Sequence, residues 1–309
     1  MSLLRRALLA GSTNHWLREQ ATRRVFVRRS VSRFMPGESV EDAVRAAAAL
    51  RSQRITTILT RLGENISRPE EAEEVTQHYL DVLRKVASAG LDAQISVKPT
   101  QLGLDQDPEL CRANLMRLVE CAEKLGNFVW IDMESSPYVE PTLGLYRKAR
   151  ERSPKVGVAL QAYLYRTAKD VEELMPLGAA IRLVKGAYLE PPSIAFPKKR
   201  DVDENFHRLA CRLLGEEARQ PGAVLHIATH DIALTDRLIR FIDETKVPAS
   251  AYEFAMLYGI QRSQQQRLAR EGRRLRVLIS YGDYWFPWYM RRLAERPANV
   301  LFVARNLFG

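Results

Sequence analysis

Cysteine is scarce in this sequence, with Cys111, Cys121 and Cys211 the only three among 309 residues. None of them stands in a CxxC pair or beside histidines at the intervals typical of a zinc site. The chain also lacks HxH and HExxH patterns, and it has no GxSxG motif that would carry a nucleophilic serine. These absences argue against a disulfide framework, a metal site and acyl transfer. We therefore expect no metal and a reducing, cytoplasmic location.

Long apolar runs are absent as well. No stretch approaches the roughly 18 apolar residues that a membrane-spanning helix needs, so no transmembrane segment is expected. Hydrophobic residues make up 46% of the chain and charged residues 27%, which is the balance of a folded globular protein. A length of 309 residues lies in the range that an α/β barrel occupies as a single unit.

Acidic residues are nearly missing from the N-terminal stretch 5–33, which holds eight arginines and only Glu19 as an acid. This stretch could be a mitochondrial presequence, a helix that lies peripherally on a membrane surface, or a solvated helical face, and we favour the solvated face. The formal net charge of +10 also admits a basic nucleic-acid-binding protein, although the positive charge is spread thinly over the rest of the chain.

A helix is predicted to start at Ser39, which with Asp42 forms an N-terminal capping pattern before the alanine-rich run 43–50. We place an N-terminal helical region at 1–50, packed on a barrel at 51–309. Within that barrel, short β-branched runs alternate with longer segments of helical period, which is typical of βαβ units. The eight runs are Ile55 to Leu62, Ala93 to Lys98, Phe128 to Met133, Val156 to Ala162, Ala180 to Lys185, Val224 to Thr229, Ser250 to Met256 and Leu275 to Tyr281.

A glycine-rich dinucleotide-binding loop is the next absence. An open, doubly wound sheet usually shows GxGxxG after its first strand, whereas here the first run ends in Leu62-Gly63-Glu64-Asn65. Eight parallel strands can instead close into a barrel that leaves no edge strand unpaired. We therefore predict an α/β fold of the (β/α)8 TIM-like barrel class, with N-terminal helices before the first strand.

Polar and charged side chains recur where these strands end. In a (β/α)8 barrel the carboxyl ends of all strands converge on one face, where functional residues gather. Arg182 and Lys185 stand out, because an apolar parallel strand rarely carries two cations without an anion to meet them. A phosphate-bearing cofactor or an acidic ligand would supply that anion, and a barrel that binds a phosphorylated metabolite without redox chemistry is an alternative. The strand-end residues are Lys98, Asp132, Met133, Glu134, Gln161, Arg182, Lys185, Thr229, His230, Glu253 and Leu257.

The pair Arg291-Arg292, followed by Glu295, lies in the last predicted helix after an aromatic stretch that includes Trp285 and Trp288. Arginines in a helix are commonly solvated, and Arg291 with Glu295 could be a simple i,i+4 pair. The aromatic surroundings favour another interpretation. A guanidinium fork binds a carboxylate through two hydrogen bonds, which suits a small amino or hydroxy acid.

Taken together, these segments resemble the proline dehydrogenase family over most of the chain, in its monofunctional bacterial form. The resemblance rests on eight motifs in the same order rather than on any one of them. They are Thr60-Arg61-Leu62-Gly63-Glu64, Ser96-Val97-Lys98, Trp130-Ile131-Asp132-Met133-Glu134, Leu160-Gln161-Ala162-Tyr163, Arg182-Leu183-Val184-Lys185-Gly186-Ala187-Tyr188, Ala228-Thr229-His230, Glu253-Phe254 with Leu257 and Gly259, and Arg291-Arg292 with Glu295.

The resemblance implies a distorted barrel that binds FAD noncovalently and oxidises L-proline to Δ1-pyrroline-5-carboxylate, the first step of proline catabolism to glutamate. It also implies electron transfer to a membrane quinone, which would give the basic stretch a role at the inner face of a membrane. The sequence shows no aldehyde dehydrogenase domain, so a separate pyrroline-5-carboxylate dehydrogenase is expected. Nucleic acid is not an expected partner under this interpretation.

The resemblance also assigns roles to individual residues. Asp132, near the ring nitrogen of proline, and Arg182, near flavin N5, would be the catalytic residues. Substrate binding would involve Arg291, Arg292 and Lys98 at the carboxylate, Tyr188, Leu257 and Trp288 around the ring, and Glu295 as a brace for the arginines. The flavin would be lined by Met133, Gln161, Arg182, Val184, Lys185, Gly186, Ala187, Thr229 and His230.

Two positions depart from the family pattern. The start of the eighth strand reads Val277-Leu278-Ile279-Ser280 where the family often has a tyrosine, and Trp288 stands where tyrosine is usual. These changes fall where the substrate ring would lie. Oxidation of 4-hydroxyproline or another cyclic imino acid is therefore an alternative activity.

Overall fold

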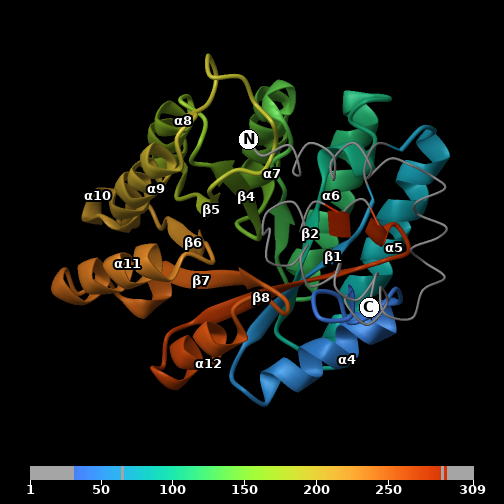
Figure 1. Cartoon of the computed structure of the whole chain (residues 1–309). Helices are drawn as coiled ribbons and strands as arrows, with labels where there is room; N and C mark the ends of the chain where they lie inside the picture. Colours follow the sequence, from blue (N-terminus) through green and yellow to red (C-terminus); the bar gives the residue numbers. More distant parts are fainter. Residues whose placement is uncertain (1–30, 64–65, 287–288, 291–309) are drawn as a thin grey trace, which may run out of the picture.

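The computed structural model describes residues 31–63, 66–286 and 289–290. Its centre is a closed barrel in which each strand pairs in parallel with the next, and β1 closes the ring by pairing with β8 (Figure 1). The predicted fold class is confirmed. The strands are β1 (Thr56–Arg61), β2 (Ala93–Val97), β3 (Val129–Ile131), β4 (Val156–Gln161), β5 (Ala180–Val184), β6 (Val224–Ala228), β7 (Tyr252–Leu257) and β8 (Leu275–Tyr281).

Helices follow the strands and cover the outside of the barrel (Figure 1). The α-helices of the described chain are α4 (Val40–Arg51), α5 (Pro69–Ser88), α6 (Pro108–Lys124), α7 (Val139–Arg152), α8 (Thr167–Leu174), α9 (Lys199–Leu214), α10 (Glu216–Arg219), α11 (Ile232–Glu244) and α12 (Arg262–Arg270). Short 3₁₀ turns add η1 (Pro99–Leu102), η2 (Ser136–Tyr138), η3 (Met175–Leu177) and η4 (Ala249–Ala251). In the described residues, no helix combines the length and the apolar character that crossing a membrane requires.

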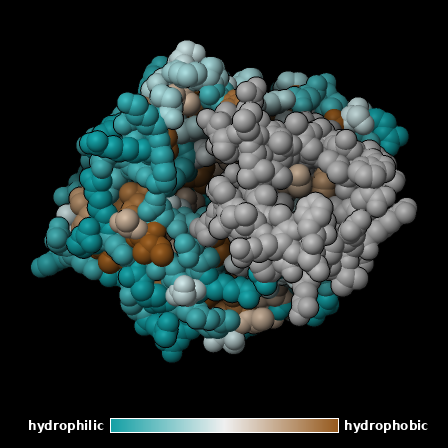
Figure 2. Space-filling view, viewed as in Figure 1, coloured by the Kyte–Doolittle hydropathy of each residue, from teal (hydrophilic) through white to brown (hydrophobic). Residues whose placement is uncertain are grey.

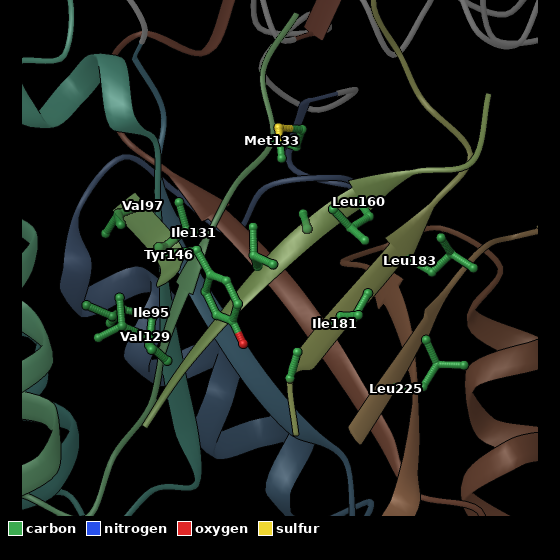
Figure 3. Packing of buried hydrophobic residues seen from close by; sticks show 14 of the residues in the cluster. Ile95, Val97, Val129, Ile131, Met133, Tyr146, Leu160, Ile181, Leu183 and Leu225 are labelled. Atoms are coloured by element: carbon green, nitrogen blue, oxygen red, sulfur yellow. The ribbon is translucent and has the colours of Figure 1, made fainter. Parts of the chain in front are cut away.

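The main hydrophobic core lies between the barrel and its helices. Ile95 and Val97 on β2, with Val129 and Ile131 on β3, are almost fully buried in it (Figure 3). Because side chains alternate along a strand, the residues between them face the barrel interior. Burying one such aliphatic side chain contributes about 1.5–3 kcal/mol, so this layer dominates the stability of the fold. The outer faces of the helices are hydrophilic, and the described surface in Figure 2 is mostly teal with small brown patches.

Helix α4 begins where the sequence predicts it. The Ser39 side chain accepts a hydrogen bond from the Asp42 backbone N–H, and the Asp42 carboxylate accepts one from the Ser39 backbone N–H. This capping box satisfies two of the N–H groups that a helix start leaves unpaired. Ala43 and Ala47 on the buried face of α4 join the main core, and the helix packs beside β8 and β1.

A second, smaller core forms where the chain passes β8. It joins Val31 and Met35 before α4 with Leu62 after β1 and with Trp285, Phe286 and Tyr289. The Trp285 indole N–H also donates to the Glu38 carboxylate at 3.0 Å. The segment after β8 therefore packs on residues from the beginning of the described chain, while α4 packs against β8 and β1.

Candidate active site

A cavity of about 390 Å³ lies at the carboxyl ends of the strands, within the range of about 300–1,000 Å³ typical of small-molecule sites. It is lined by inward-facing strand residues and by the first residues of the loops that follow. Twelve of its lining residues are predicted site residues. These are Asp132, Met133, Gln161, Arg182, Val184, Lys185, Gly186, Ala187, Tyr188, Thr229, His230 and Leu257.

Arg182 lies at the bottom of this cavity, buried on β5 with 4% of its surface exposed. Its Nη2 donates to the Asp132 carboxylate and to Ser96 Oγ at 3.0 Å, while Ser96 Oγ donates to Asp132 Oδ1 at 2.8 Å. Burial lowers the pKa of Arg182, and the charge of Asp132 raises it in part. An arginine guanidinium still stays protonated in proteins, so Arg182 and Asp132 form a charged pair.

The Nη1 atom of Arg182 is different. It is buried, and no hydrogen-bond partner contacts it in the described residues. A buried N–H donor left unpaired costs about 1–3 kcal/mol, so such atoms usually mark a place where a ligand or water binds. The cavity thus presents a fixed cationic donor at its bottom.

Gln161 presents the complementary group at the end of β4. Its Nε2 donates to the Glu134 backbone carbonyl at 2.7 Å, which identifies the remaining side-chain atom, Oε1, as an acceptor. This Oε1 is buried and has no partner in the described part of the chain. Glu134 is itself held in place, because its carboxylate accepts from Thr100 Oγ1 at 2.7 Å and from the Thr100 backbone N–H at 3.1 Å. The acceptor is therefore positioned by two successive loops.

Lys185 follows β5 and is held by carboxylates of this chain. Its Nζ contacts Asp203 on α9 and lies 2.9 Å from Asp231, the N-cap residue of α11. Lys199 contacts the same two carboxylates. Burial of Asp231 acts to raise its pKa, but hydrogen bonds from both lysines outweigh it and hold the pKa well below the usual value.

This pairing changes the argument made from charge alone. The sequence suggested that Arg182 and Lys185 require an external anion. In the structure Asp132 faces Arg182, and Asp203 faces Lys185. The two cations therefore do not by themselves imply a bound phosphate.

His230 stands after β6, and its ring is oriented by the backbone of the next strand. Its Nε2 accepts a hydrogen bond from the Leu257 N–H at 2.9 Å, so the neutral ring carries its proton on Nδ1. Thr229, beside it, accepts from the Asp231 N–H at 3.2 Å. These contacts connect the ends of β6 and β7 on one side of the cavity.

The segment after β5 forms the rim of the cavity. Gly186 has a φ of +113°, and a Cβ at this position would lie 2.2 Å from the Tyr163 ring, so only glycine fits. Further along, the Glu190 carboxylate accepts from Ser136 N–H and Ser136 Oγ, both at 2.7 Å. The β5 segment that includes Tyr188 is thereby tied to the loop after β3.

Lys98 does not line this cavity. It is half-buried after β2, and its Nζ donates to the Gly63 carbonyl at 3.4 Å. Four of the predicted substrate-binding residues, Trp288, Arg291, Arg292 and Glu295, lie outside the described residues.

Several lining residues were not predicted as part of the site. Ala159, Ala228 and Ala255 lie two positions before Gln161, His230 and Leu257 on their strands. Inward-facing residues repeat every second position, so counting back from the strand-end residues would have found them. The other unpredicted lining residues are Ile58 and Met256, whereas Leu278 was expected near the substrate ring and lines the cavity.

Comparison with known proteins now decides the family. The sequence model described as "Proline dehydrogenase" matches residues 43–305, which is most of the chain. The chain belongs to the proline dehydrogenase family. Among curated relatives, Proline dehydrogenase 1 of Bacillus subtilis subsp. natto is 38% identical over 276 residues, covering 89% of each chain. The Proline dehydrogenase of Deinococcus radiodurans is 37% identical over 280 residues, again covering 89% of each chain.

Solved structures share the family fold. A structure titled proline utilization A from Bdellovibrio bacteriovorus, inactivated by N-propargylglycine, superposes with a TM-score of 0.80 at 22% identity over 86% of this chain. Proline utilization A from Corynebacterium freiburgense gives a TM-score of 0.76 at 21% identity over 96% of this chain. This chain spans about a third of the length of these proteins, 32% and 33% respectively.

Proposed function

We propose that this protein is an FAD-dependent proline dehydrogenase that oxidises L-proline to Δ1-pyrroline-5-carboxylate, the first step of proline catabolism to glutamate. Membership of the family supports the reaction. The observation in the structure that carries the cofactor assignment is the pair of buried, unpartnered atoms in the cavity, Arg182 Nη1 and Gln161 Oε1. A flavin ring has both hydrogen-bond acceptors and an N–H donor along its edge, so it can satisfy both atoms.

The residues around the cavity fit such a ring. Arg182 would donate at the N5 side, where its positive charge favours the electron-rich reduced ring. Gln161 Oε1 would accept from the ring edge, and small residues such as Gly186 and Ala187 allow close approach of a flat ligand. The other residues proposed to hold FAD are Met133, Val184, Lys185, Thr229 and His230, all of which line the cavity.

When bound, FAD would accept a hydride from proline C5, the ring carbon that is bonded to the nitrogen and does not carry the carboxylate. The protein has to hold that carbon close to the flavin and keep the amine able to lose its proton. Asp132 lines the cavity beside Arg182 and would orient the amine. Because Asp132 is also paired with Arg182, a change at either residue would disturb both the amine and the flavin side of the site.

The carboxylate and ring of proline would be bound by residues from several segments. We propose that Arg291 and Arg292 hold the carboxylate with help from Lys98, and that Glu295 braces the arginines. Tyr188 and Leu257, which line the cavity, would enclose the ring together with Trp288.

We further propose a membrane quinone as electron acceptor and peripheral association of the protein with the inner face of the membrane. The eight arginines of the stretch 5–33 support the second point, because basic segments bind anionic lipid surfaces. Conversion of the product to glutamate is an aldehyde oxidation. We propose that a separate pyrroline-5-carboxylate dehydrogenase carries out that step.

One specific observation favours a second substrate. Leu278, which stands where the family often has tyrosine, lines the cavity. Leucine removes a hydroxyl and a ring from the space beside the substrate, so 4-hydroxyproline or another cyclic imino acid is the alternative substrate.

The decisive experiment is a visible spectrum of the purified protein before and after anaerobic addition of L-proline. We expect a flavin absorption band that bleaches with L-proline and stays unchanged with D-proline. A protein that does not bind FAD even after reconstitution would refute the cofactor assignment. Bleaching by 4-hydroxyproline but not by proline would select the second substrate, and a bound flavin that no imino acid reduces would favour a ligand-binding barrel without redox chemistry.

A further inference from the structure

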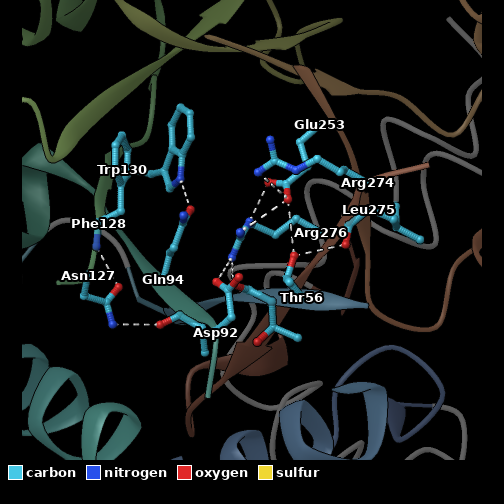
Figure 4. A network of polar contacts seen from close by, with 12 residues as sticks. Thr56, Asp92, Gln94, Asn127, Phe128, Trp130, Glu253, Arg274, Leu275 and Arg276 are labelled. Atoms are coloured by element: carbon cyan, nitrogen blue, oxygen red, sulfur yellow. Dashed lines mark hydrogen bonds and ion pairs between the residues drawn. The ribbon is translucent and has the colours of Figure 1, made fainter. Parts of the chain in front are cut away.

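The barrel interior beneath the cavity is polar, whereas the interior of a (β/α)8 barrel is usually filled by branched aliphatic side chains. We call Trp130, His226, Glu253 and Arg276 the barrel floor. These four side chains lie on β3, β6, β7 and β8, and each is less than 5% exposed. Figure 4 shows Trp130 bonded to Gln94 and, in a separate set of contacts, Glu253 bonded to Arg276.

Trp130 is held firmly in this floor. Its indole N–H donates to Gln94 Oε1 at 2.7 Å (Figure 4), which fixes one edge of the ring. Gly157 on β4 makes room for the other edge, because a Cβ there would lie 2.6 Å from Cζ3 of Trp130. The φ of Gly157 is not in the left-handed region, so glycine is required here for space rather than for backbone conformation.

The guanidinium of Arg182 lies against this ring. Its Cζ is 5.3 Å from the Trp130 ring centroid, a distance at which the ring attracts a cation. Asp132 and Ser96 both contact Nη2, so among the described residues hydrogen bonds hold only one end of the guanidinium. Contact with the Trp130 ring restrains the plane of the group and thereby sets the direction of the unpartnered Nη1.

The other residues of the barrel floor place no further uncompensated charge beside Trp130 and Arg182. The His226 ring centroid is 4.2 Å from that of Trp130, and His226 Nε2 lies 3.2 Å from the Glu253 carboxylate. Burial lowers the pKa of His226 to about 4, so the ring is neutral at pH 7 and adds no positive charge beside Arg182. Glu253 is balanced by Arg276, whose Nε donates to it at 2.7 Å.

We propose that Trp130, in the space created by Gly157, is a positioning residue for Arg182, and that it thereby sets the reduction potential of the bound flavin and the rate of its reduction by substrate. This inference rests on the proposed function. Trp130 does not line the cavity, so it acts through Arg182 rather than by contact with substrate or cofactor.

The test compares Trp130→Leu, Trp130→Phe and Gly157→Ala with wild type, all loaded with FAD. In Trp130→Leu, we expect anaerobic flavin reduction by proline to slow about tenfold, because the variant loses one moderate cation–π contact. The substrate Kd should stay within about twofold, and the flavin midpoint potential should become more negative.

Two further variants grade the effect. Trp130→Phe keeps an aromatic face, so its reduction rate and midpoint potential should lie between those of wild type and Trp130→Leu. Gly157→Ala should act in the same direction as Trp130→Leu, and the double variant should be no slower than the single leucine variant.

Phe206→Leu is the matched control, because Phe206 is an equally buried aromatic on α9, outside the barrel interior. It should lower thermal stability without moving the potential. The inference is overturned if Trp130→Leu, folded and flavin-loaded, reduces at the wild-type rate and potential. If that variant does not fold, a wild-type potential in both Trp130→Phe and Gly157→Ala overturns it instead. A wild-type protein that binds no FAD would reject the proposed function, which is a different result.

Discussion

At the scale of single residues, Gly186 shows how a cavity rim depends on a missing side chain. Alanine at this position would combine an unfavourable positive φ with a collision against the Tyr163 ring. We expect Gly186→Ala to lower the free energy of unfolding by about 3 kcal/mol. It should also weaken FAD binding, because the displaced rim lines the cavity. Urea unfolding and FAD titration of the apoprotein measure the two effects.

Gly126 supplies the matched control for this change. Its φ is +65°, but a Cβ there would meet nothing within 4 Å. Gly126→Ala should therefore cost only the backbone strain, about 1 kcal/mol, and leave FAD affinity unchanged. Equal losses in the two variants would show that the Tyr163 contact does not matter.

Arg291 and Arg292 carry the prediction that concerns the substrate directly. Replacing either with methionine removes a bidentate donor for a carboxylate but keeps the length of the side chain. We expect KM for proline to rise by about two orders of magnitude with a normal flavin content, which corresponds to about 3 kcal/mol of lost binding. Steady-state kinetics and the flavin-to-protein absorbance ratio provide the measurement. Loss of flavin from either variant would contradict the substrate role.

Two histidines show how contacts between distant segments decide whether a side chain is buried. His78 lies in a charged helical segment, which is typical of a surface position, yet it is half-buried and its Nε2 lies 2.8 Å from the Tyr281 hydroxyl. His226 lies within an apolar strand, which is typical of a core position, and the structure buries it against Glu253. Neighbours along the chain do not reveal such contacts, because the partners come from β7 and β8.

At the scale of elements, the loops after β3 and β5 act as one unit through Glu190 and Ser136. The two hydrogen bonds to the Glu190 carboxylate are to a charged acceptor and together contribute about 1.5–3 kcal/mol. We expect Glu190→Ala to raise the amide hydrogen-exchange rates of residues 186–196 by more than tenfold without exposing the core strands. Exchange followed by mass spectrometry gives the result segment by segment.

Glu172→Ala is a suitable comparison, since Glu172 on α8 pairs with Arg212 on α9 at the exposed surface. Its removal should leave exchange in 186–196 unchanged, because solvent-exposed ion pairs contribute little. Unchanged exchange in Glu190→Ala as well would mean that other contacts hold the rim.

At the scale of the whole molecule, many arginines on the described surface form ion pairs with acidic residues of neighbouring segments. Arg117 on α6 contacts Glu73 on α5, and Arg273 contacts Asp243 on α11 at 2.6 Å. Such pairs favour a solvated surface around the barrel over a continuous basic patch for nucleic acid. The basic stretch 5–30 lies outside the described residues.

The buried histidines should make the stability of the whole fold depend on pH. Burial lowers the pKa of His226 from its usual 6.5 to about 4, so between these values the unfolded chain binds more protons than the folded one. The contribution of His226 to the free energy of unfolding is therefore fully present above pH 6.5 and is lost as the pH drops toward 4. We expect a loss on the order of 2 kcal/mol from this residue across that window.

His226→Gln provides the check, because glutamine can donate to Glu253 but does not titrate. Its free energy of unfolding, measured in urea at several pH values from 7 to 4.5, should vary less with pH than that of wild type. Burial also lowers the pKa of His78 to about 4. His78 should therefore account for part of the pH dependence that remains in the variant. Identical slopes in the variant and wild type would contradict the assignment to His226.

The sequence by itself determined the eight strands, the end of the barrel at which the cavity opens, and twelve of its lining residues. The strands and the strand-end residues follow from local patterns, because alternation of apolar residues and the order of strands and helices are written within short segments. The lining residues Val184, Gly186, Ala187 and Tyr188 were predicted from the family resemblance instead. Only the tertiary structure decided which groups meet. Arg182 pairs with Asp132 across 50 positions, Lys185 with Asp231 across 46, and Trp130 occupies space left by Gly157 on the next strand. Closure of the barrel brings these partners together, and no local pattern encodes a contact between side chains on different strands.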